Sequence, residues 1–207
     1  MHLKRQAAIT KLPIPRKGTK YVARSLSNIS SSVPVVIAVR DMLKIARTAA
    51  EVKKMINEKL LTINGRAVKD HRESIQIFNI LGAGKNYFLT FLPTGKFVFH
   101  ETKSHDIRLC KVINKKLLKK NKIQLNLHDG SNIMSDKKIS VGDSLLISFK
   151  GEIKEHLPFE KGKDVFVISG KYAGLKGKIK SIENEKVDII LENKNSTILN
   201  KYQVIVQ

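Results

Sequence analysis

The sequence predicts an α+β chain built from several modules. Apolar residues recur at helical spacing between residues 34 and 56, whereas short apolar segments alternate with turn residues from residue 75 onward. The chain has 39 Lys and Arg against 18 Asp and Glu, so its formal net charge is +21 over 207 residues. Such an excess is typical of proteins that bind a polyanion. We expect a basic extended segment (1–32), a helical and hairpin domain (33–92), a central all-β domain (93–158) and a small C-terminal barrel (159–207).

Composition excludes several classes of protein. Hydrophobic residues make up 42% of the chain, which is enough for packed cores and excludes a wholly disordered basic tail. The single cysteine, Cys110, excludes an internal disulfide framework and fits a reducing compartment. The longest apolar run, Val33–Val39, is far shorter than the ~20 residues that span a bilayer. We therefore expect a soluble cytoplasmic protein that contacts no membrane.

The N-terminal segment carries positive charge only. No Asp or Glu precedes Asp41, and the apolar residues of the segment follow neither a helical nor a strand period. Such a stretch lacks the apolar surface that would offset the entropy of ordering, so we expect it to be unfolded until it binds a polyanion. The residues expected to contact phosphates are Lys4, Arg5, Lys11, Arg16, Lys17, Lys20 and Arg24.

The first helix is predicted from about Pro34 to Ala46. Ser32 is a suitable N-cap, and proline is tolerated in a first helical turn. Spacings of three and four residues place four apolar residues on one stripe, namely Val36, Val39, Leu43 and Ala46. Basic residues recur on another face at i, i+4 and i+7, namely Arg40, Lys44 and Arg47.

A second helix and a hairpin are predicted next. Thr48-Ala49-Ala50-Glu51 matches a capping box, and the helix that it opens exposes Lys53 and Lys54. Residues 60–63 predict a strand, and Asn64-Gly65 predicts a type I′ turn. The surface expected to face phosphates consists of Arg40, Lys44, Arg47, Lys53, Lys54 and Arg66. The alternative is that Arg40 and Lys54 are ordinary surface charges beside Asp41 and Glu58.

The middle of the chain predicts short strands. They are expected at 75–78, 86–91, 96–100, 109–112, 123–127 and 145–149, with turn signals at 82–84 and 92–95. Residues 107–128 form a second window without Asp or Glu. The lysines of this window that we expect to bind a polyanion are Lys115, Lys116, Lys119 and Lys120.

The last module follows a linker predicted at 156–158. Five short strands are expected at 165–168, 178–182, 187–191, 196–199 and 203–206, and their number and length favour a small barrel of the SH3 type. The glycine-rich loop 169–177 joins the first two strands. It presents Lys171, Tyr172 and Lys176 to a polyanion, although it is equally typical of a tight turn.

Three resemblances coincide on these segments. Residues 40–68, with Ala46-Arg47-Thr48-Ala49-Ala50-Glu51 and Leu61-Thr62-Ile63-Asn64-Gly65, resemble the S-four-type RNA-binding fold, and residues 163–182 resemble the KOW motif. Pro13-Ile14-Pro15-Arg16-Lys17, Leu109-Cys110-Lys111-Val112 and residues 123–130 are similar to the archaeal and eukaryotic small-subunit ribosomal protein four-e family. The chain ends without the basic extension of eukaryotic members, so it resembles the short archaeal form.

This resemblance implies a structural ribosomal protein with small-subunit ribosomal RNA and neighbouring ribosomal proteins as its partners. The alternatives are an RNA-modifying enzyme that uses the helical domain as an anchor, or a KOW-type transcription factor. Three small modules leave too little chain for a catalytic domain, and a transcription factor would not explain the two acid-free windows.

Local motifs predict no catalytic residue, cofactor, metal or small-molecule substrate. Gly82-Ala83-Gly84-Lys85 lacks the first glycine and the final Ser or Thr of a P-loop. His100, His105 and Cys110 offer three zinc ligands, but no fourth Cys or His lies nearby. Since Cys110 stands in a predicted half-buried strand, we expect a core thiol there.

Overall fold

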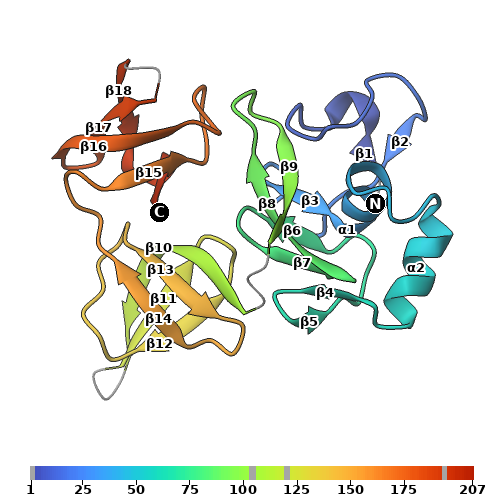
Figure 1. Cartoon of the computed structure of the whole chain (residues 1–207), viewed down its shortest axis with the longest axis horizontal. Helices are drawn as coiled ribbons and strands as arrows, with labels where there is room; N and C mark the ends of the chain where they lie inside the picture. The colour runs from blue at the N-terminus through green and yellow to red at the C-terminus, as the bar shows by residue number, and fades with distance from the viewer. Residues whose placement is uncertain (1–2, 103–105, 119–121, 193–194) are drawn as a thin grey trace. The chain divides into compact units, whose positions relative to one another are not determined.

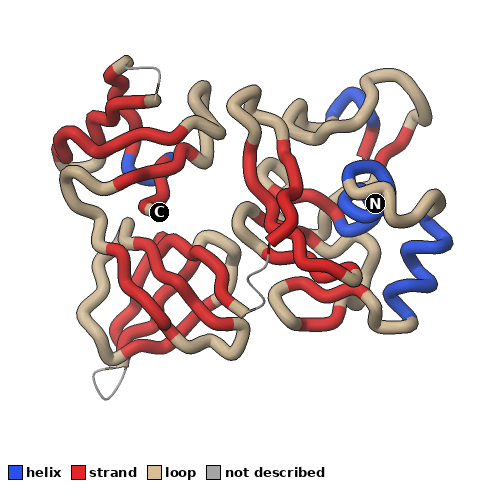
Figure 2. Tube along the Cα trace, viewed as in Figure 1, coloured by secondary structure: helices blue, strands red, loops and turns tan. Residues whose placement is uncertain are grey.

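The computed structural model of the protein describes residues 3–102, 106–118, 122–192 and 195–207. Contacts divide the chain into two compact units, residues 1–106 and 107–207. Strands make up most of the regular structure in both units, and the described helices are short (Figure 1 and Figure 2). The protein is therefore mostly β, with much less helix than the predicted α+β class implies.

The first unit is built around one antiparallel sheet. Its strands, with those of two short ladders, are β1 (Leu3–Lys4), β2 (Tyr21–Val22), β3 (Ser32–Pro34), β4 (Leu61–Ile63), β5 (Arg66–Ala67), β6 (Ser74–Gln76), β7 (Ile80–Ala83), β8 (Lys85–Phe91) and β9 (Phe97–Thr102). The sheet order is β5-β4-β7-β8-β9, while β1 pairs with β2 and β3 with β6. The helical segments are a 3-10 turn, η1 (Arg5–Ala7), the helices α1 (Val35–Ile37) and α2 (Ala49–Asn57), and a π-turn, η2 (Ala38–Met42).

The helix predicted over 34–46 is much shorter than expected. Ser32 is not its N-cap, because Ser32 and Pro34 pair with β6 as part of strand β3. Residues Val33–Val39 are all buried, so this segment has no exposed helical face. It is rich in β-branched side chains, whose restricted χ1 angles lower helix propensity. Burial of a β-branched run therefore overrides the periodic pattern on which the prediction rested.

A π-turn ends this helical segment early. Leu43 N donates to Ala38 O, five residues earlier, and Ile45 N donates to Val39 O. Lys44 then takes a φ of 56°, in the left-handed region that ends a helix. The expected apolar stripe is partly present, since Val39 and Ala46 are buried whereas Leu43 is half-buried.

The second helix begins as predicted. Thr48 Oγ1 accepts a hydrogen bond from Glu51 N at 3.2 Å, and Glu51 Oε2 accepts one from Arg47 N at 2.8 Å. These bonds satisfy backbone donors that a helix start leaves unpaired. Val52 and Ile56 are buried on α2, whereas Lys53 and Lys54 are exposed, which confirms the predicted helix and its exposed lysines.

The hairpin at Asn64-Gly65 is confirmed, while strand β7 was not predicted. Asn64 and Gly65 both have positive φ, at 51° and 78°, as a type I′ turn requires. Of the expected turn 82–84, only Gly84 turns the chain, with a φ of 75°. Gly82 lies within β7, where a Cβ would stand 2.4 Å from Thr62 Oγ1 on β4. Gly82 therefore permits close packing of two strands.

Strands β8 and β9 form a hairpin across the turn at residues 92–95. Gly95 N donates to Leu92 O at 2.8 Å, which confirms that turn. Residues 86–91 of β8 pair with 97–102 of β9. The domain boundary expected between residues 92 and 93 consequently falls inside a hairpin of the first unit.

The second unit contains two five-stranded antiparallel sheets, each with its own core. The first comprises β10 (Ile107–Leu117), β11 (Ile123–Leu127), β12 (Asn132–Ser135), β13 (Ser144–Ser148) and β14 (Ile153–Leu157), in the order β12-β11-β10-β13-β14. The second comprises β15 (Asp164–Val167), β16 (Lys176–Glu183), β17 (Lys186–Leu191), β18 (Ser196–Asn200) and β19 (Val204–Val206), in the order β18-β17-β16-β15-β19. A 3-10 turn, η4 (Lys201–Gln203), precedes β19. All five strands predicted after residue 160 are present.

The segment expected as a linker at 156–158 is mostly structured. His156 and Leu157 belong to β14, and His156 Nε2 lies 2.7 Å from Asp143 Oδ2. The other oxygen of that buried carboxylate accepts a bond from Phe159 N at 3.0 Å. Because Asp143 holds residues on both sides of Pro158, the chain passes between the two sheets along a fixed path.

Buried polar bonds also join the two sheets of this unit. The Lys111 side chain on β10 is 2% exposed, and its Nζ donates to Lys201 O at 2.5 Å and to Val204 O. Ser144 Oγ on β13 accepts a bond from Val206 N at 3.0 Å. Lys111 Nζ also lies 5.9 Å from the centre of the Phe159 ring. The Lys111 side chain thus connects the two sheets inside the second unit.

Candidate nucleic-acid interface

Arg5 closes the N-terminal segment into a loop. Its Nε donates to Thr19 O at 2.7 Å, Nη1 to Pro15 O at 2.6 Å and Nη2 to Thr19 Oγ1 at 2.9 Å. Gly18 has a φ of 140°, and a Cβ there would lie 3.0 Å from Arg5 Nη2. The segment therefore has a definite fold, contrary to the expected unfolded chain, because one side chain satisfies two loop carbonyls and one hydroxyl. Three of the five guanidinium donors are occupied in this way.

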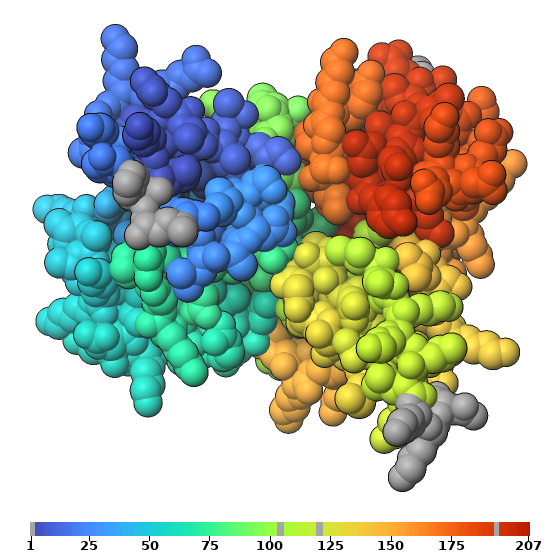
Figure 3. Space-filling model, turned by 180° about the vertical axis from the view of Figure 1, so that it is seen from behind, coloured from blue at the N-terminus to red at the C-terminus, as the bar shows by residue number. Residues whose placement is uncertain are grey.

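Four other cations of the loop are exposed. They line, with Arg5 and uncharged residues, a cavity of about 450 Å³ that has no carboxylate in its wall. Within the described residues none of these cations takes part in an ion pair, and the loop lies at the surface of the first unit (Figure 3, dark blue). They are Lys4, Arg16, Lys17 and Lys20.

Two predicted contact residues of this segment are less accessible. The Lys11 ammonium lies 5.0 Å from the centre of the Phe91 ring, and burial lowers the pKa of Lys11. Arg24 is half-buried. Both therefore offer less surface to a ligand than Arg16 or Lys17 does.

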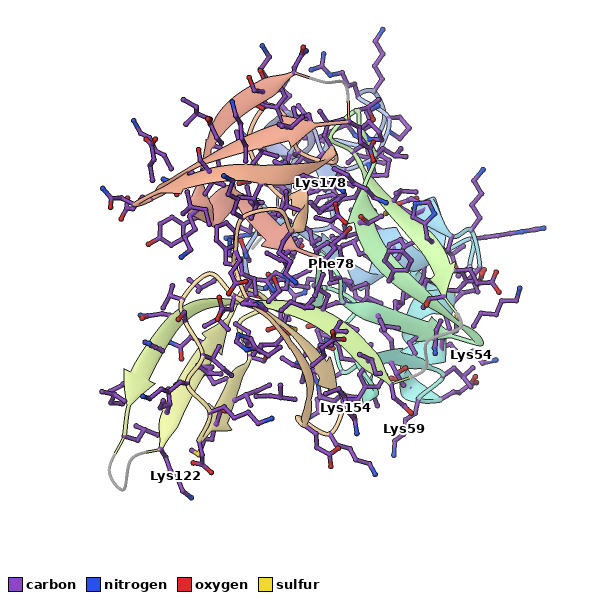
Figure 4. All side chains as sticks on the ribbon, turned by 60° about the vertical axis from the view of Figure 1, so that its left-hand side comes forward. Lys54, Lys59, Phe78, Lys122, Lys154 and Lys178 are labelled. Carbon is purple, nitrogen blue, oxygen red and sulfur yellow. The ribbon has the colours of Figure 1, made fainter. Side chains whose placement is uncertain are left out.

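Helix α2 presents the second group of exposed cations. Lys53 and Lys54 on α2 and Arg47 just before it are exposed. Among the described residues, only Lys54 of these three forms a side-chain ion pair, with Nζ 3.9 Å from Glu58 Oε1, while the Arg47 backbone N–H donates to Glu51. A surface pair at that distance is weak. Lys59, which the sequence prediction omits, follows the end of the helix and is also exposed, as Figure 4 shows with Lys54. Counting cations to two residues beyond the end of the helix would have included it.

Two predicted contact residues are engaged by carboxylates. Arg40 donates through Nε and Nη2 to the two oxygens of Asp41, at 2.9 and 2.8 Å. This side-chain hydrogen bond raises the pKa of the Arg40 guanidinium. Arg66 forms an ion pair with Glu73. The pairing with Asp41 matches the alternative that treated Arg40 as an ordinary paired charge.

Arg40, Lys44 and Arg47 do not share a helical face. The helical segment ends at Met42, and Lys44 adopts a left-handed conformation. Because the i, i+4, i+7 rule holds only within a continuous helix, the predicted alignment is wrong. Lys44 and Arg47 are nevertheless exposed, so each stays a candidate contact on its own.

The acid-free window 107–128 divides into buried and exposed cations. Arg108 pairs with the nearly buried carboxylate of Asp129, and Lys111 is buried between the sheets. Lys115 and Lys116 are exposed, while Lys119 and Lys120 lie outside the described residues. Lys122, just before β11 and beyond that gap, is exposed as well (Figure 4).

The glycine-rich loop of the C-terminal sheet is a tight turn that carries two exposed lysines. Gly170 and Gly174 have φ values of 90° and 94°. Tyr172 packs against the core of this sheet, and the Lys171 ammonium lies 5.8 Å from the centre of its ring. Lys171 and Lys176 are exposed, whereas the Tyr172 ring is partly buried against the core. A ligand at this loop therefore meets two cations and no fully open aromatic ring.

The described histidines and the cysteine do not assemble a metal site. No three His, Cys, Asp or Glu side chains gather among them as metal ligands would, and His105 falls outside the described ranges. Cys110 is buried, and desolvation raises the pKa of its thiol to about 12. None of the described helices is long and apolar enough to cross a membrane.

Comparison with known families gives two matches. Residues 83–152 match the model of ribosomal family S4e, and residues 161–192 match the KOW motif. The first match covers β8–β13, and the second covers the glycine-rich loop with strands β15–β17.

Individual relatives extend this similarity over most of the chain. Small ribosomal subunit protein eS4 of Methanocaldococcus jannaschii is 37% identical over 211 residues, which cover 93% of this chain and 86% of the relative. The eS4 protein of Methanospirillum hungatei is 35% identical and covers 86% of this chain and 78% of the relative. The crystal structure of 30S ribosomal protein S4e from Thermoplasma acidophilum shares the fold, with a TM-score of 0.73, 24% identity and coverage of 86% and 95%.

Proposed function

The chain belongs to ribosomal family S4e and is a structural, non-enzymatic constituent of the small ribosomal subunit, and we propose that it holds ribosomal RNA mainly through phosphate contacts. The observation that carries this proposal is the N-terminal loop. There, Arg5 fixes the backbone while Lys4, Arg16, Lys17 and Lys20 surround a cavity without a carboxylate.

Preorganisation of the loop supports phosphate binding. An RNA backbone approaching the loop meets cations that have no competing carboxylate, and it displaces only water and counterions from them. Because Arg5 has already closed the loop, less entropy is lost on binding than for a free chain. The exposed cations of α2 would add further phosphate contacts in the first unit. Contacts of this kind recognise the shape of A-form RNA more than its sequence.

We also propose how the other modules take part. The five strands after residue 160 form an SH3-like barrel, whose KOW loop contributes Lys171 and Lys176. Neighbouring ribosomal proteins and small-subunit ribosomal RNA are the partners, and the cytoplasm is the compartment. The relatives named above are ribosomal proteins, which favours this function over an RNA-modifying enzyme or a free transcription factor.

The proposal predicts the salt dependence of RNA binding. Replacing Arg16, Lys17 and Lys20 by Ala removes up to three phosphate contacts, and each contact contributes a slope of roughly 0.7–0.9 to log K against log salt. The slope should therefore fall in magnitude by about 2 to 3 in a filter-binding titration with small-subunit ribosomal RNA of Methanocaldococcus jannaschii.

A matched control separates these contacts from loss of net charge. Lys85 is a surface lysine whose Nζ lies 2.9 Å from Glu101 Oε1, so its charge is already compensated. Lys85→Ala should leave the slope almost unchanged. An unchanged slope in the triple variant, with circular dichroism confirming its fold, would remove the N-terminal loop from the interface.

A further inference from the structure

One face of the sheet β12-β11-β10 carries a row of carboxamide side chains. Asn114 on β10 is the cross-strand partner of Asn126 on β11, which in turn partners Asn132 on β12. Residues at such positions have Cβ atoms about 4.5–5.5 Å apart. The neighbouring row on the same face consists of Lys116, Gln124 and Met134. We call these six residues the amide face.

The amide face lies opposite the core of the sheet. Leu125, which alternates with Gln124 and Asn126 along β11, is fully buried in that core. Asn114, Lys116 and Asn132 are exposed, and Met134 is 64% exposed. A strand face without aliphatic residues at its central positions is poorly suited to pack against another protein core.

The amides have hydrogen-bonding capacity beyond their contacts with each other. Gln124 Nε2 donates to Asn126 Oδ1 at 3.0 Å, and Asn114 Oδ1 accepts a bond from Lys115 N at 2.8 Å. Each primary amide carries two N–H donors and an oxygen that accepts twice, so these bonds use only part of the capacity. The face therefore offers donors and acceptors side by side, with one ammonium and no carboxylate.

We propose that the amide face binds an RNA segment through ribose 2′-hydroxyls and base edges. This inference rests on the proposed function and adds a neutral contact surface to the phosphate-binding cations. Asn and Gln side chains match groups that both donate and accept hydrogen bonds, as the 2′-hydroxyl and base edges do. The face has no aromatic residue, whereas protein–protein interfaces are enriched in aromatics. Lys116 and nearby Lys122 give the amide face a positive charge, which attracts RNA.

Salt titration distinguishes neutral contacts from phosphate contacts. In the variant Asn114→Ala/Asn126→Ala/Asn132→Ala, affinity for Methanocaldococcus jannaschii small-subunit ribosomal RNA should fall about ten- to a hundredfold, with the slope of log K against log salt unchanged. Lys116→Ala on the same face should instead reduce the slope by about 1. Gln207→Ala, an exposed amide at the C-terminus, serves as the control and should leave both quantities unchanged.

Each outcome of this experiment has one meaning. Wild-type affinity in the triple variant overturns the amide face, as does a reduced slope in that variant. Loss of incorporation into small subunits with unchanged RNA affinity would assign the face to a neighbouring protein. Failure of the wild-type protein to bind RNA would overturn the proposed function itself. If the triple variant does not fold, Asn132→Asp at the exposed edge strand keeps the shape, and its added charge should weaken binding at least tenfold.

Discussion

Lys111 shows how the fold changes the role of a residue that the sequence counts as a cation. Lys111 belongs to the acid-free window 107–128, yet its side chain is 2% exposed and donates to two carbonyls of the C-terminal segment. Burial, followed by the charge of Lys201, lowers the pKa of Lys111 to about 7. The sequence around Lys111 alternates as an ordinary strand, so nothing local indicates that a second sheet covers it.

Replacement of Lys111 should change how stability depends on pH. With a pKa of about 7 in the folded state and 10.5 ordinarily, Lys111 makes the unfolded chain bind more protons between these values. The free energy of unfolding of the wild type therefore rises from pH 7 to 10, by up to ~4 kcal/mol. Lys111→Met should lack this rise, so the variant loses stability relative to wild type as pH increases. Urea unfolding at pH 7, 8.5 and 10 measures this, with exposed Lys115→Met as the control. Parallel pH profiles for the wild type and Lys111→Met would contradict it.

Cys110 provides a second test at the residue scale. Desolvation, with a smaller effect from Asp129, raises the pKa of the thiol to about 12, so only ~10⁻⁴ of it is ionised at pH 8. A disulfide-exchange reagent should consequently label the native protein at least a hundredfold more slowly than the urea-unfolded chain. Equal labelling rates in the two states would show that the thiol is not part of the core.

Secondary structure was predictable where a few adjacent residues determine it. The capping box at Thr48 and the type I′ turn at Asn64-Gly65 satisfy or orient the backbone locally, and both are confirmed. The helix expected over 34–46 and the turn expected at Gly82 failed for the opposite reason. The burial of the β-branched run Val33–Val39 and the close approach of Thr62 to Gly82 both depend on partners far away in the sequence. Neither hydrophobic periodicity nor the composition of a turn contains information about such partners.

The N-terminal loop makes a prediction at the scale of one element. Arg5→Lys keeps the charge but loses the fork of donors that holds Pro15 and Thr19. Limited trypsin digestion of the free protein should then cleave within residues 6–20 several times faster than in the wild type. Arg16→Lys, at an exposed position, should not change the rate of cleavage elsewhere in the loop. Equal resistance of Arg5→Lys and wild type would show that other contacts close the loop.

At the scale of the whole molecule, charge composition predicted the class of partner, while the fold decides which cations can reach it. Of the expected contact residues, those of the N-terminal loop and of α2 are mostly exposed and unpaired within the described chain. Arg40 and Arg66 form ion pairs with Asp41 and Glu73. No sequence spacing distinguishes cations that are paired in this way from cations that remain available to RNA. The amide face escaped prediction entirely, because its members come from three strands whose register only the structure reveals.

Sedimentation of the full-length protein in ribosome extracts tests the central claim most directly. An epitope-tagged chain, followed by immunoblotting through sucrose gradients, should sediment with the small subunit and persist there after a wash at moderate salt. Progressive release at higher salt is expected, since phosphate contacts weaken as counterion concentration rises. Recovery of the protein at the top of the gradient, or with the large subunit, would contradict the account.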